Sequence, residues 1–300
     1  MHVMGGGDVG GAKTQIMNTV TGLNRNNDVM LISFRAGPFA DEARERGIDV
    51  RVIERHNPFR AARTMRDLVD EFKPDIIHCH GGRANLMGAM VRRSRRIPII
   101  TTVHSDYRLD YLGSPLKQHT LGTANAIALR FLDFYQPVAD RMARTLIERG
   151  FDPERIVKIY NGMEFNRPEG EFDRAAYLRE TYGAEIEEGD VLCGIAARLT
   201  AVKDIATTVR GFAEALRTAP QLRLFIAGDG EDADMLKKLC DQLGVRERVT
   251  FCGWVSPVMP FFRAMNINLL SSVSETFPYS ILEGVCAGCA TICSDVGGMT

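Results

Sequence analysis

Long hydrophobic runs are missing from this sequence: no uninterrupted apolar stretch approaches the roughly 20 residues that a membrane-spanning helix needs. The apolar segment at the N-terminus is far too short for a signal peptide, which predicts a cytoplasmic protein. The formal net charge of -1 over 300 residues provides no overall attraction to nucleic acid. An ordinary globular protein is therefore predicted, in which any anionic partner meets a local basic patch.

The cysteines do not form a disulfide framework. There are seven, an odd number, and most lie in apolar segments, which is typical of reduced thiols that pack as small hydrophobic groups. Cys286, Cys289 and Cys293 have a spacing close to that of metal ligands. However, no second CxxC pair or neighbouring histidine completes a set of four. No metal site is predicted there.

Short apolar runs alternate with longer amphipathic stretches in two series, which predicts parallel strands separated by helices. Strands are expected at 29–34, 50–53, 76–78 and 97–103, and again at 191–197, 222–227, 249–252, 267–271 and 290–294. A polar stretch at 168–190 separates the two series. The fold class is thus α/β with two Rossmann-like domains, residues 1–167 and 168–300. In such sheets ligands collect beyond the carboxyl ends of the strands, here in a cleft between domains.

Two helices show a clear apolar stripe. Ile16, Val20 and Leu23 fall on one face of the first predicted helix. A second stripe comprises Ile205, Val209, Phe212 and Leu216. Each stripe predicts a helix with one face buried against a sheet.

The glycine-rich opening GGGDVGGAKT, residues 5–14, precedes a helix and allows three interpretations. Its G-x-G-x-x-G spacing matches a dinucleotide fingerprint, but the next strand ends Phe34-Arg35 without the acidic residue that binds a ribose. NAD is therefore disfavoured, and NADP bound through Arg35 stays open. A phosphate-binding P-loop would need Lys13 directly after Gly11, and one residue intervenes.

The third interpretation uses Gly10 and Gly11 for close approach of a ligand. Only backbone without a side chain lets a phosphate or sugar come near the N-terminus of the following helix. This interpretation needs binding groups from a second domain, and the sequence supplies candidates.

Two cations, Arg198 and Lys203, follow the first strand of the second domain. A cation just before a helix N-terminus is unfavourable unless an anion binds there. A guanidinium and an ammonium together can stabilise a departing pyrophosphate without a metal ion. Both residues are predicted to bind a diphosphate.

Two carboxylates, Glu275 and Glu283, lie eight positions apart in ETFPYSILEG, between a strand end and a helix. Pro278 suits a first helical position, so the N–H groups of Tyr279 and Ser280 are expected to meet a phosphate. Carboxylates accept hydrogen bonds from sugar hydroxyls. By itself the decapeptide allows two interpretations: a nucleotide-sugar site, or a strand–turn–helix whose acids are a helix-start charge and part of a solvated face.

Histidines and arginines of the first domain add further candidates. His104 follows the strand at 97–103 and is expected at the cleft edge, where it can contact a sugar hydroxyl. His78 and His80 alternate along one strand face, which favours packing or cleft lining over a metal site. The sequence VRRSRR contains a basic cluster, expected either to be solvated or to attract an anionic membrane face. Its arginines are Arg92, Arg93, Arg95 and Arg96.

These motifs together resemble family 4 glycosyltransferases of the GT-B fold, across nearly the whole chain. The matching segments are Gly10-Gly11, DIIHCHGG at 75–82, VHSD at 103–106, YNGMEF at 160–165, Arg198 with Lys203, AGDGED at 227–232, ETFPYSILEG, and SDVGG at 294–298.

The resemblance implies a retaining transfer of a sugar from a nucleotide diphosphate sugar, with no metal or other cofactor. It assigns Arg198 and Lys203 to the diphosphate, Glu275 to the transferred sugar, and Glu283 to the ribose. Gly11 would approach the donor phosphate, and His104 the sugar near its reacting carbon. A UDP-sugar is the expected donor. The acceptor is expected to be a glycan, a lipid-linked sugar or a small molecule, bound mainly by the first domain.

Two departures from the family pattern bear on these expectations. Pro278 replaces a common glycine, which shifts the phosphate contact to Tyr279 and Ser280. Similar proteins also continue beyond the turn at 296–298, so the C-terminal domain is expected to be truncated. Two alternatives remain open: a sugar-nucleotide epimerase of the same fold, and an NADP-binding oxidoreductase.

Overall fold

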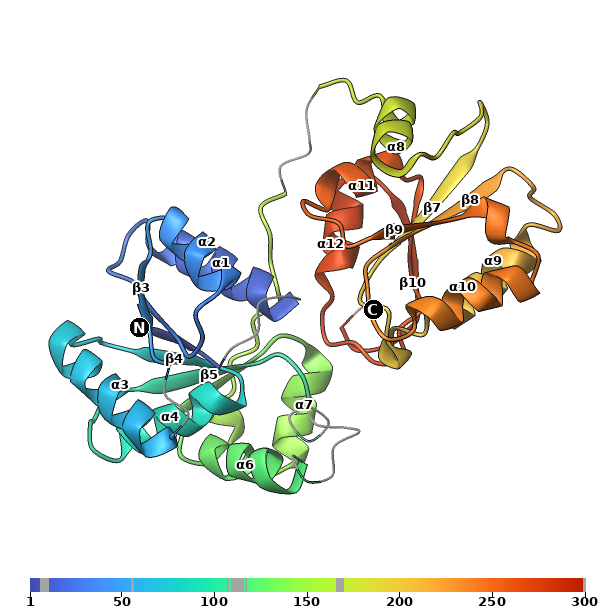
Figure 1. The fold of residues 1–300 in the computed structure, drawn as a ribbon. Coiled ribbons are helices and arrows are strands. Elements are labelled where there is room, and N and C mark those ends of the chain that lie inside the picture. The colour runs from blue at the N-terminus through green and yellow to red at the C-terminus, as the bar shows by residue number, and fades with distance from the viewer. Residues whose placement is uncertain are drawn as a thin grey trace. The chain divides into compact units, whose positions relative to one another are not determined.

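The computed structural model describes residues 1–5, 11–54, 57–106, 108, 116, 118–165 and 170–298. It divides into two compact units, Met1–Gly162 and Met163–Thr300. The boundary predicted between residues 167 and 168 falls within 166–169, which lies outside the described residues. Each unit contains its own parallel sheet with helices on both faces, so the α/β fold class predicted from the sequence is confirmed (Figure 1).

In the described part of unit 1 the sheet has the strand order β3-β2-β1-β4-β5-β6, and every pairing is parallel. The strands are β1 (His2–Met4), β2 (Met30–Ser33), β3 (Asp49–Val52), β4 (Ile77–His80), β5 (Ile99–Val103) and β6 (Phe134–Pro137). Strand β6 was not predicted. The order reverses between β1 and β4, which is the place where ligands bind in many open parallel sheets.

Successive apolar residues of the unit 1 strands face opposite sides of the sheet, and helices cover both sides. Val3 of β1 faces the core beneath the helices at 58–72 and 82–92, while Met4 faces the core beneath the helices at 11–23 and 38–45. The helices are α1 (Gly11–Leu23), α2 (Pro38–Glu45), α3 (Pro58–Phe72), α4 (Gly82–Arg92), α6 (Thr123–Leu129) and α7 (Asp140–Glu148). A π-helical turn, η1 (Gln118–Gly122), precedes α6, and the 3₁₀ turn η2 (Pro153–Arg155) follows α7.

Local signals explain where several of these helices start and stop. The side chain of Asn57 accepts hydrogen bonds from the backbone N–H groups of Phe59 and Arg60, and Pro58 occupies the first turn of α3.

The stripe predicted for α1 is partly wrong. Ile16 and Val20 are buried, but Leu23 is 42% exposed because it is the last residue of the helix, beyond the edge of the core.

In unit 2 the described strands pair in parallel in the order β11-β10-β7-β8-β9. Their bounds lie within one residue of those predicted from the sequence. They are β7 (Val191–Ala196), β8 (Leu222–Ala227), β9 (Val249–Gly253), β10 (Ile267–Leu270) and β11 (Ala290–Cys293). Here the order reverses between β7 and β10. The loops after these two strands are those that contain Lys203 and Glu275.

Helices cover both faces of this second sheet (Figure 1). They are α8 (Arg174–Tyr182), α9 (Ile205–Ala215), α10 (Ala233–Gln242), α11 (Met259–Ala264) and α12 (Tyr279–Cys286), with 3₁₀ turns η3 (Ala201–Lys203) and η4 (Arg246–Arg248). Val209 of α9 packs in one core with Ile195, and Phe261 of α11 packs in the other with Phe225. None of the helices within the described ranges is both long and apolar enough to cross a bilayer.

Candidate functional site

The loops after β7 and β10 meet through a direct ion pair between Lys203 and Glu275. The ammonium of Lys203 contacts Oε1 of Glu275, and the hydroxyl of Ser272 donates to the same oxygen at 2.7 Å. The two charged side chains are only 21% and 10% exposed. Two residues that the sequence assigned separately to a ligand are thus in contact with each other, at the point where the strand order reverses.

Backbone and hydroxyl contacts hold these two loops together independently of the ion pair. The N–H of Val273 donates to the carbonyl of Val202 at 3.0 Å. Ser271 Oγ donates to the carbonyl of Asp204 at 2.8 Å and lies 2.7 Å from Thr208 Oγ1 of α9. Lys203 and Glu275 are therefore held at a fixed spacing, which a site for a charged ligand requires.

The turn after β11 supports the Glu275 loop from the other side. The N–H of Gly298 donates to the carbonyl of Thr276 at 2.7 Å, and Ser294 Oγ donates to that of Ser272 at 2.6 Å. Gly297 has φ +69°, and a Cβ there would lie 2.1 Å from the carbonyl oxygen of Glu275. Glycine at this position therefore allows the turn to approach the loop that positions Glu275.

Arg198 lies in a loop that packs against the glycines of AGDGED. Gly228 has φ +136°, and a Cβ there would lie 1.9 Å from the carbonyl oxygen of Ala197. The N–H of Leu199 donates to the carbonyl of Asp229 at 2.9 Å. Arg198 itself is exposed, and it forms no ion pair with any residue that the structure describes. Its guanidinium is thus available to an anionic ligand.

Glu283 lies on α12, and its partly buried carboxyl group forms no ion pair with any of the described residues. Burial raises the pKa of Glu283 to about 7. It is the only carboxyl group in the described ranges whose pKa is raised. A carboxyl group with this pKa is partly protonated at neutral pH. It becomes a strong acceptor when a ligand donates hydroxyl hydrogen bonds to it.

The start of α12 differs slightly from the prediction. Pro278 is not the first helical residue: with φ -76° and ψ 130° it is extended and precedes the helix, which begins at Tyr279. Tyr279 and Ser280 are therefore the first two residues of α12, so their N–H groups belong to its first turn. Asn268 of β10 donates from Nδ2 to the carbonyl of Ser280 at 2.9 Å and anchors this turn to the sheet.

Gly284 allows α12 to lie this close to β10, since a Cβ there would come within 2.3 Å of Asn268 Nδ2. Asn268, Gly284 and Gly297 were not singled out from the sequence. The only signal for them was their position inside or next to the matched motifs.

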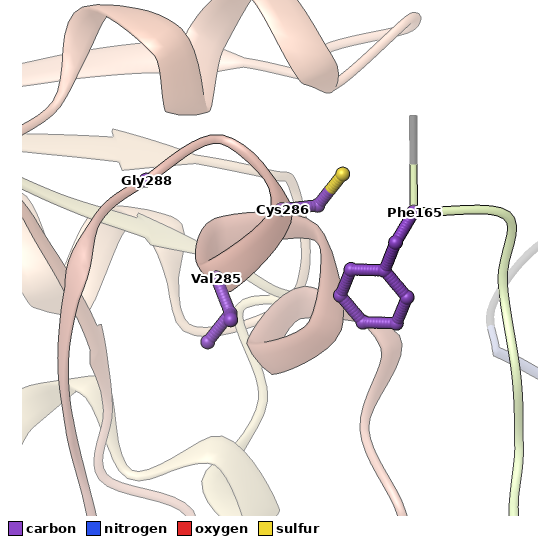
Figure 2. A pocket seen from close by; sticks show the side chains of 4 residues that line it. All are labelled: Phe165, Val285, Cys286 and Gly288. Atoms are coloured by element: carbon purple, nitrogen blue, oxygen red, sulfur yellow. The ribbon is translucent and has the colours of Figure 1, made fainter. Parts of the chain in front are cut away.

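A separate hollow of about 360 Å³ lies beside the C-terminal end of α12, lined by Val285, Cys286, Gly288 and Phe165. Figure 2 shows the ring of Phe165 turned toward this end of the helix. The described residues that line it carry no charged side chain. The nearby Cys289 donates its thiol to the carbonyl of Phe262 at 3.2 Å, as a protonated, packed cysteine does.

In unit 1, His104 directly follows β5, as predicted. Burial lowers the pKa of His104 to about 4, so the ring is neutral near neutral pH. Its Nε2 atom is buried and has no hydrogen-bond partner in the part of the chain that the structure describes. A buried ring nitrogen without a partner at the carboxyl edge of a parallel sheet is suited to bind a ligand hydroxyl.

Three other histidines lie on the sheet face beside His104. His2 pairs in register with His78, and its Nδ1 lies 3.2 Å from Nε2 of His80. The candidate ligand nitrogens of these three residues lie within 4.8 Å of one another. Nitrogens bound to one tetrahedral ion are roughly 3.4 Å apart, so the set is looser than a formed metal site. We therefore interpret His78 and His80 as packing or cleft-lining residues, and the structure adds His2 to this group.

The glycine-rich opening is only partly described. Gly10 lies outside the described residues, and Gly11 is the first residue of α1. Lys13 lies within α1, and its ammonium pairs with Glu42 of α2 at 2.8 Å.

The arginine cluster is not uniformly available. Arg92 forms a bidentate pair with Asp133, with distances of 2.9 and 2.8 Å. Arg95 forms another with Asp70, at 2.7 and 2.5 Å. Within the described ranges, Arg93 and Arg96 form no ion pair. Only half of the predicted patch is therefore free to meet a partner.

Comparison with known proteins defines the class of protein to which this geometry belongs. A crystal structure of an Anabaena protein in complex with UDP-glucose superimposes with a TM-score of 0.82 at 20% identity, covering 99% of this chain and 81% of that one. This likeness establishes the fold. The model of Glycosyltransferase Family 4 matches residues 9–167, and that of Glycosyl transferases group 1 matches residues 183–300. The chain belongs to glycosyltransferase family 4.

Curated relatives support this assignment. An uncharacterized glycosyltransferase of Methanocaldococcus jannaschii is 29% identical over 76% of this chain and 59% of its own length. The alpha-monoglucosyldiacylglycerol synthase of Streptococcus pneumoniae is 25% identical over 80% of this chain and 56% of its own length. The chain thus spans somewhat more than half the length of these relatives.

Proposed function

We propose that this protein is a retaining glycosyltransferase that moves a sugar from a nucleotide diphosphate sugar to an acceptor hydroxyl without a metal ion. The observation that carries the proposal is the pairing of Lys203 with Glu275 where the strand order of unit 2 reverses, with Arg198 exposed in the same loop as Lys203. This arrangement offers positive charge for a diphosphate and a carboxylate for a sugar.

The donor would be bound by residues of unit 2. Its diphosphate would contact Arg198 and Lys203 and the first N–H groups of α12, at Tyr279 and Ser280. The diphosphate would compete with Glu275 for the ammonium of Lys203, which frees the carboxylate to accept hydrogen bonds from the hydroxyls of the transferred sugar. Glu283 would accept hydrogen bonds from the ribose hydroxyls.

In the reaction, the bond between the sugar's anomeric carbon and the diphosphate oxygen breaks, and the nucleoside diphosphate leaves with the bonding electrons. The acceptor oxygen forms its new bond on the same face, and its proton passes to the leaving phosphate. Arg198 and Lys203 would stabilise the negative charge that develops on that phosphate, the task that a metal ion performs elsewhere. The resemblance to the family assigns His104 of unit 1 to the transferred sugar, and Gly10 and Gly11 to close approach of the donor.

UDP is the nucleotide that we favour, because a protein of the same fold has been solved with UDP-glucose. The acceptor class stays open between a glycan, a lipid-linked sugar and a small molecule. One relative is named as a synthase of a glucosylated diacylglycerol, which favours the lipid-linked class. A sugar-nucleotide epimerase is the second candidate, and incubation of the donor without acceptor distinguishes the two, since an epimerase would yield an epimer.

Calorimetric titration with UDP tests the donor site directly. Lys203→Glu should weaken UDP binding by at least tenfold, because it replaces a charge-assisted hydrogen bond with repulsion. Lys237→Glu on α10, whose exposed ammonium lies near Asp234, is the matched control and should bind as the wild type does. Unchanged affinity in Lys203→Glu would show that the diphosphate is not bound here.

A further inference from the structure

Positive charge is concentrated in one part of unit 1. Between Asp75 and Asp133 the sequence contains eight arginines and lysines but only two acidic residues, Asp106 and Asp110, a net charge of +6 in a chain whose total is -1. This segment comprises β4, α4, β5 and α6. A charge difference of this size within one unit indicates an anionic partner.

Two cations of this segment, Arg93 and Arg96, lie where α4 ends and form no ion pair with the residues that the structure describes. The bidentate bond of Arg92 to Asp133 joins the end of α4 to the residue before β6. Arg96 and Phe134 then line one surface hollow of about 370 Å³, together with Arg92, Ile97, Pro98 and Asp133. Because Asp133 is neutralised by Arg92, and Arg93 and Arg96 form no ion pair among the described residues, this edge of the unit is positively charged.

Large apolar side chains are exposed next to these arginines. Ile127 lies in the last turn of α6 and Phe131 in the turn that follows the helix, and they are 56% and 61% exposed. Phe134 is 41% exposed. Helix α4 packs against α6 (Figure 1). Single exposed apolar residues are ordinary, but Phe134 lines the same hollow as Arg96, and Phe131 and Ile127 precede it at the end of α6, the helix against which α4 packs.

We propose that this edge of unit 1 is a docking surface for an anionic lipid bilayer. We call it the α4–α6 face, defined by Arg93, Arg96, Ile127, Phe131 and Phe134. The arginines would contact lipid phosphates, and the phenylalanines would insert at the level of the headgroups, where aromatic rings are most stable. A nucleic acid would use the arginines but leave three apolar side chains in water, so a lipid surface fits the face better.

The proposal extends the expected role of the arginine cluster. The sequence predicted membrane contact through four arginines, but Arg92 and Arg95 are occupied by carboxylates and the apolar half of the face was not foreseen. The surface lies entirely in unit 1, and lipid binding by it does not depend on the transferase proposal. Only its purpose, to bring the protein to a lipid-linked acceptor, rests on that proposal.

Co-sedimentation with vesicles tests the surface without any donor or acceptor. The wild type should bind vesicles of phosphatidylcholine with added phosphatidylglycerol, and bind phosphatidylcholine alone far more weakly, with affinity falling as salt rises. The double variant Arg93→Gln/Arg96→Gln should bind about thirtyfold more weakly, since each arginine near an anionic surface contributes about fivefold. Phe131→Ser/Phe134→Ser should also lose binding, although it keeps every charge.

Matched controls come from the same unit. Arg141→Gln/Arg144→Gln removes two exposed arginines from α7, and Phe59→Ser removes an apolar side chain that is 72% exposed. Both should bind vesicles as the wild type does, and all four variants should keep the wild-type affinity for UDP. If the wild type fails to bind anionic vesicles, or the arginine controls lose as much binding as Arg93→Gln/Arg96→Gln, the proposal is wrong. If Phe131→Ser/Phe134→Ser binds vesicles as strongly as the wild type, the face is only a non-specific anion site, and the proposal of a bilayer-docking surface is also wrong.

Discussion

Replacing Glu283 with glutamine should make the protein more stable, and by an amount that depends on pH. Burial raises the pKa of Glu283 from 4.5 to about 7. A shift of this size corresponds to about 3 kcal/mol. The folded state favours the protonated carboxyl group, so ionisation of this group lowers the free energy of unfolding as pH rises from 4.5 to about 7. Glutamine has nearly the same shape but does not ionise.

The free energy of unfolding of Glu283→Gln should therefore equal that of the wild type at about pH 4, and exceed it by about 3 kcal/mol at about pH 8. The single tryptophan, Trp254, lies in unit 2, so its fluorescence during urea denaturation reports the unit that contains Glu283. The same variant should lose most of its UDP affinity, because the neutral amide accepts ribose hydrogen bonds more weakly than a carboxylate.

The exposed Glu180 of α8 provides the control, since Glu180→Gln should change neither stability nor UDP affinity at any pH. A stability difference for Glu283→Gln that is the same at both pH values would refute the reasoning, because it would show that ionisation of Glu283 costs nothing in the folded state. Retained UDP affinity with the expected stability profile would instead refute only the ribose assignment.

Three further predictions follow from the same structure. Binding of UDP at about pH 7 should be accompanied by proton release, because ribose hydroxyls favour the ionised form of Glu283. Calorimetry in buffers of different ionisation enthalpy measures the number of protons released, and proton uptake would contradict the prediction. Gly297→Ala should weaken UDP binding at least tenfold, because the new Cβ would collide with the carbonyl oxygen of Glu275. Gly244→Ala is the control: Gly244 has φ +66°, and a Cβ there would have no atom within 4 Å, so this variant should lose only about 1 kcal/mol of stability and no UDP affinity. Acid should affect the two units in opposite ways. In unit 1, burial lowers the pKa values of His78 and His104 from 6.5 to about 4, so the unfolded chain binds protons more readily there and unit 1 loses stability as pH falls from 6.5 to about 4. In unit 2, protonation of the buried Glu283 stabilises the folded state as pH falls. Hydrogen exchange resolved by unit would show both trends, and equal acid sensitivity of the two units would oppose this prediction.

The periodicity of apolar residues was sufficient to predict the strands of unit 2 to within about a residue, because buried parallel strands form continuous apolar runs. Strand β6 was missed since Phe134–Pro137 contains a glutamine and ends in proline, and one of its apolar residues, Phe134, is exposed. Residue types before and after strand ends also indicated Arg198, Lys203 and Glu275 as site residues.

Contacts between loops were beyond what the sequence could show. Nothing in the spacing of Lys203 and Glu275, which are 72 positions apart, indicates that their charges meet. The pairing of Arg92 with Asp133 likewise depends on how α4 packs against α6, so a cluster that reads as four available cations has only two. The raised pKa of Glu283 arises from burial in the folded unit, and the sequence alone gave no sign of it.

The most direct test of the central claim is calorimetric titration of the wild type with UDP, first in EDTA and then in excess magnesium. The account predicts the same affinity in both, since Arg198 and Lys203 supply the charge that binds the diphosphate. GDP and ADP should bind more weakly, and NADP not at all. Binding of UDP that appears only with magnesium, or binding of NADP in place of UDP, would contradict a metal-independent nucleotide-sugar site in unit 2.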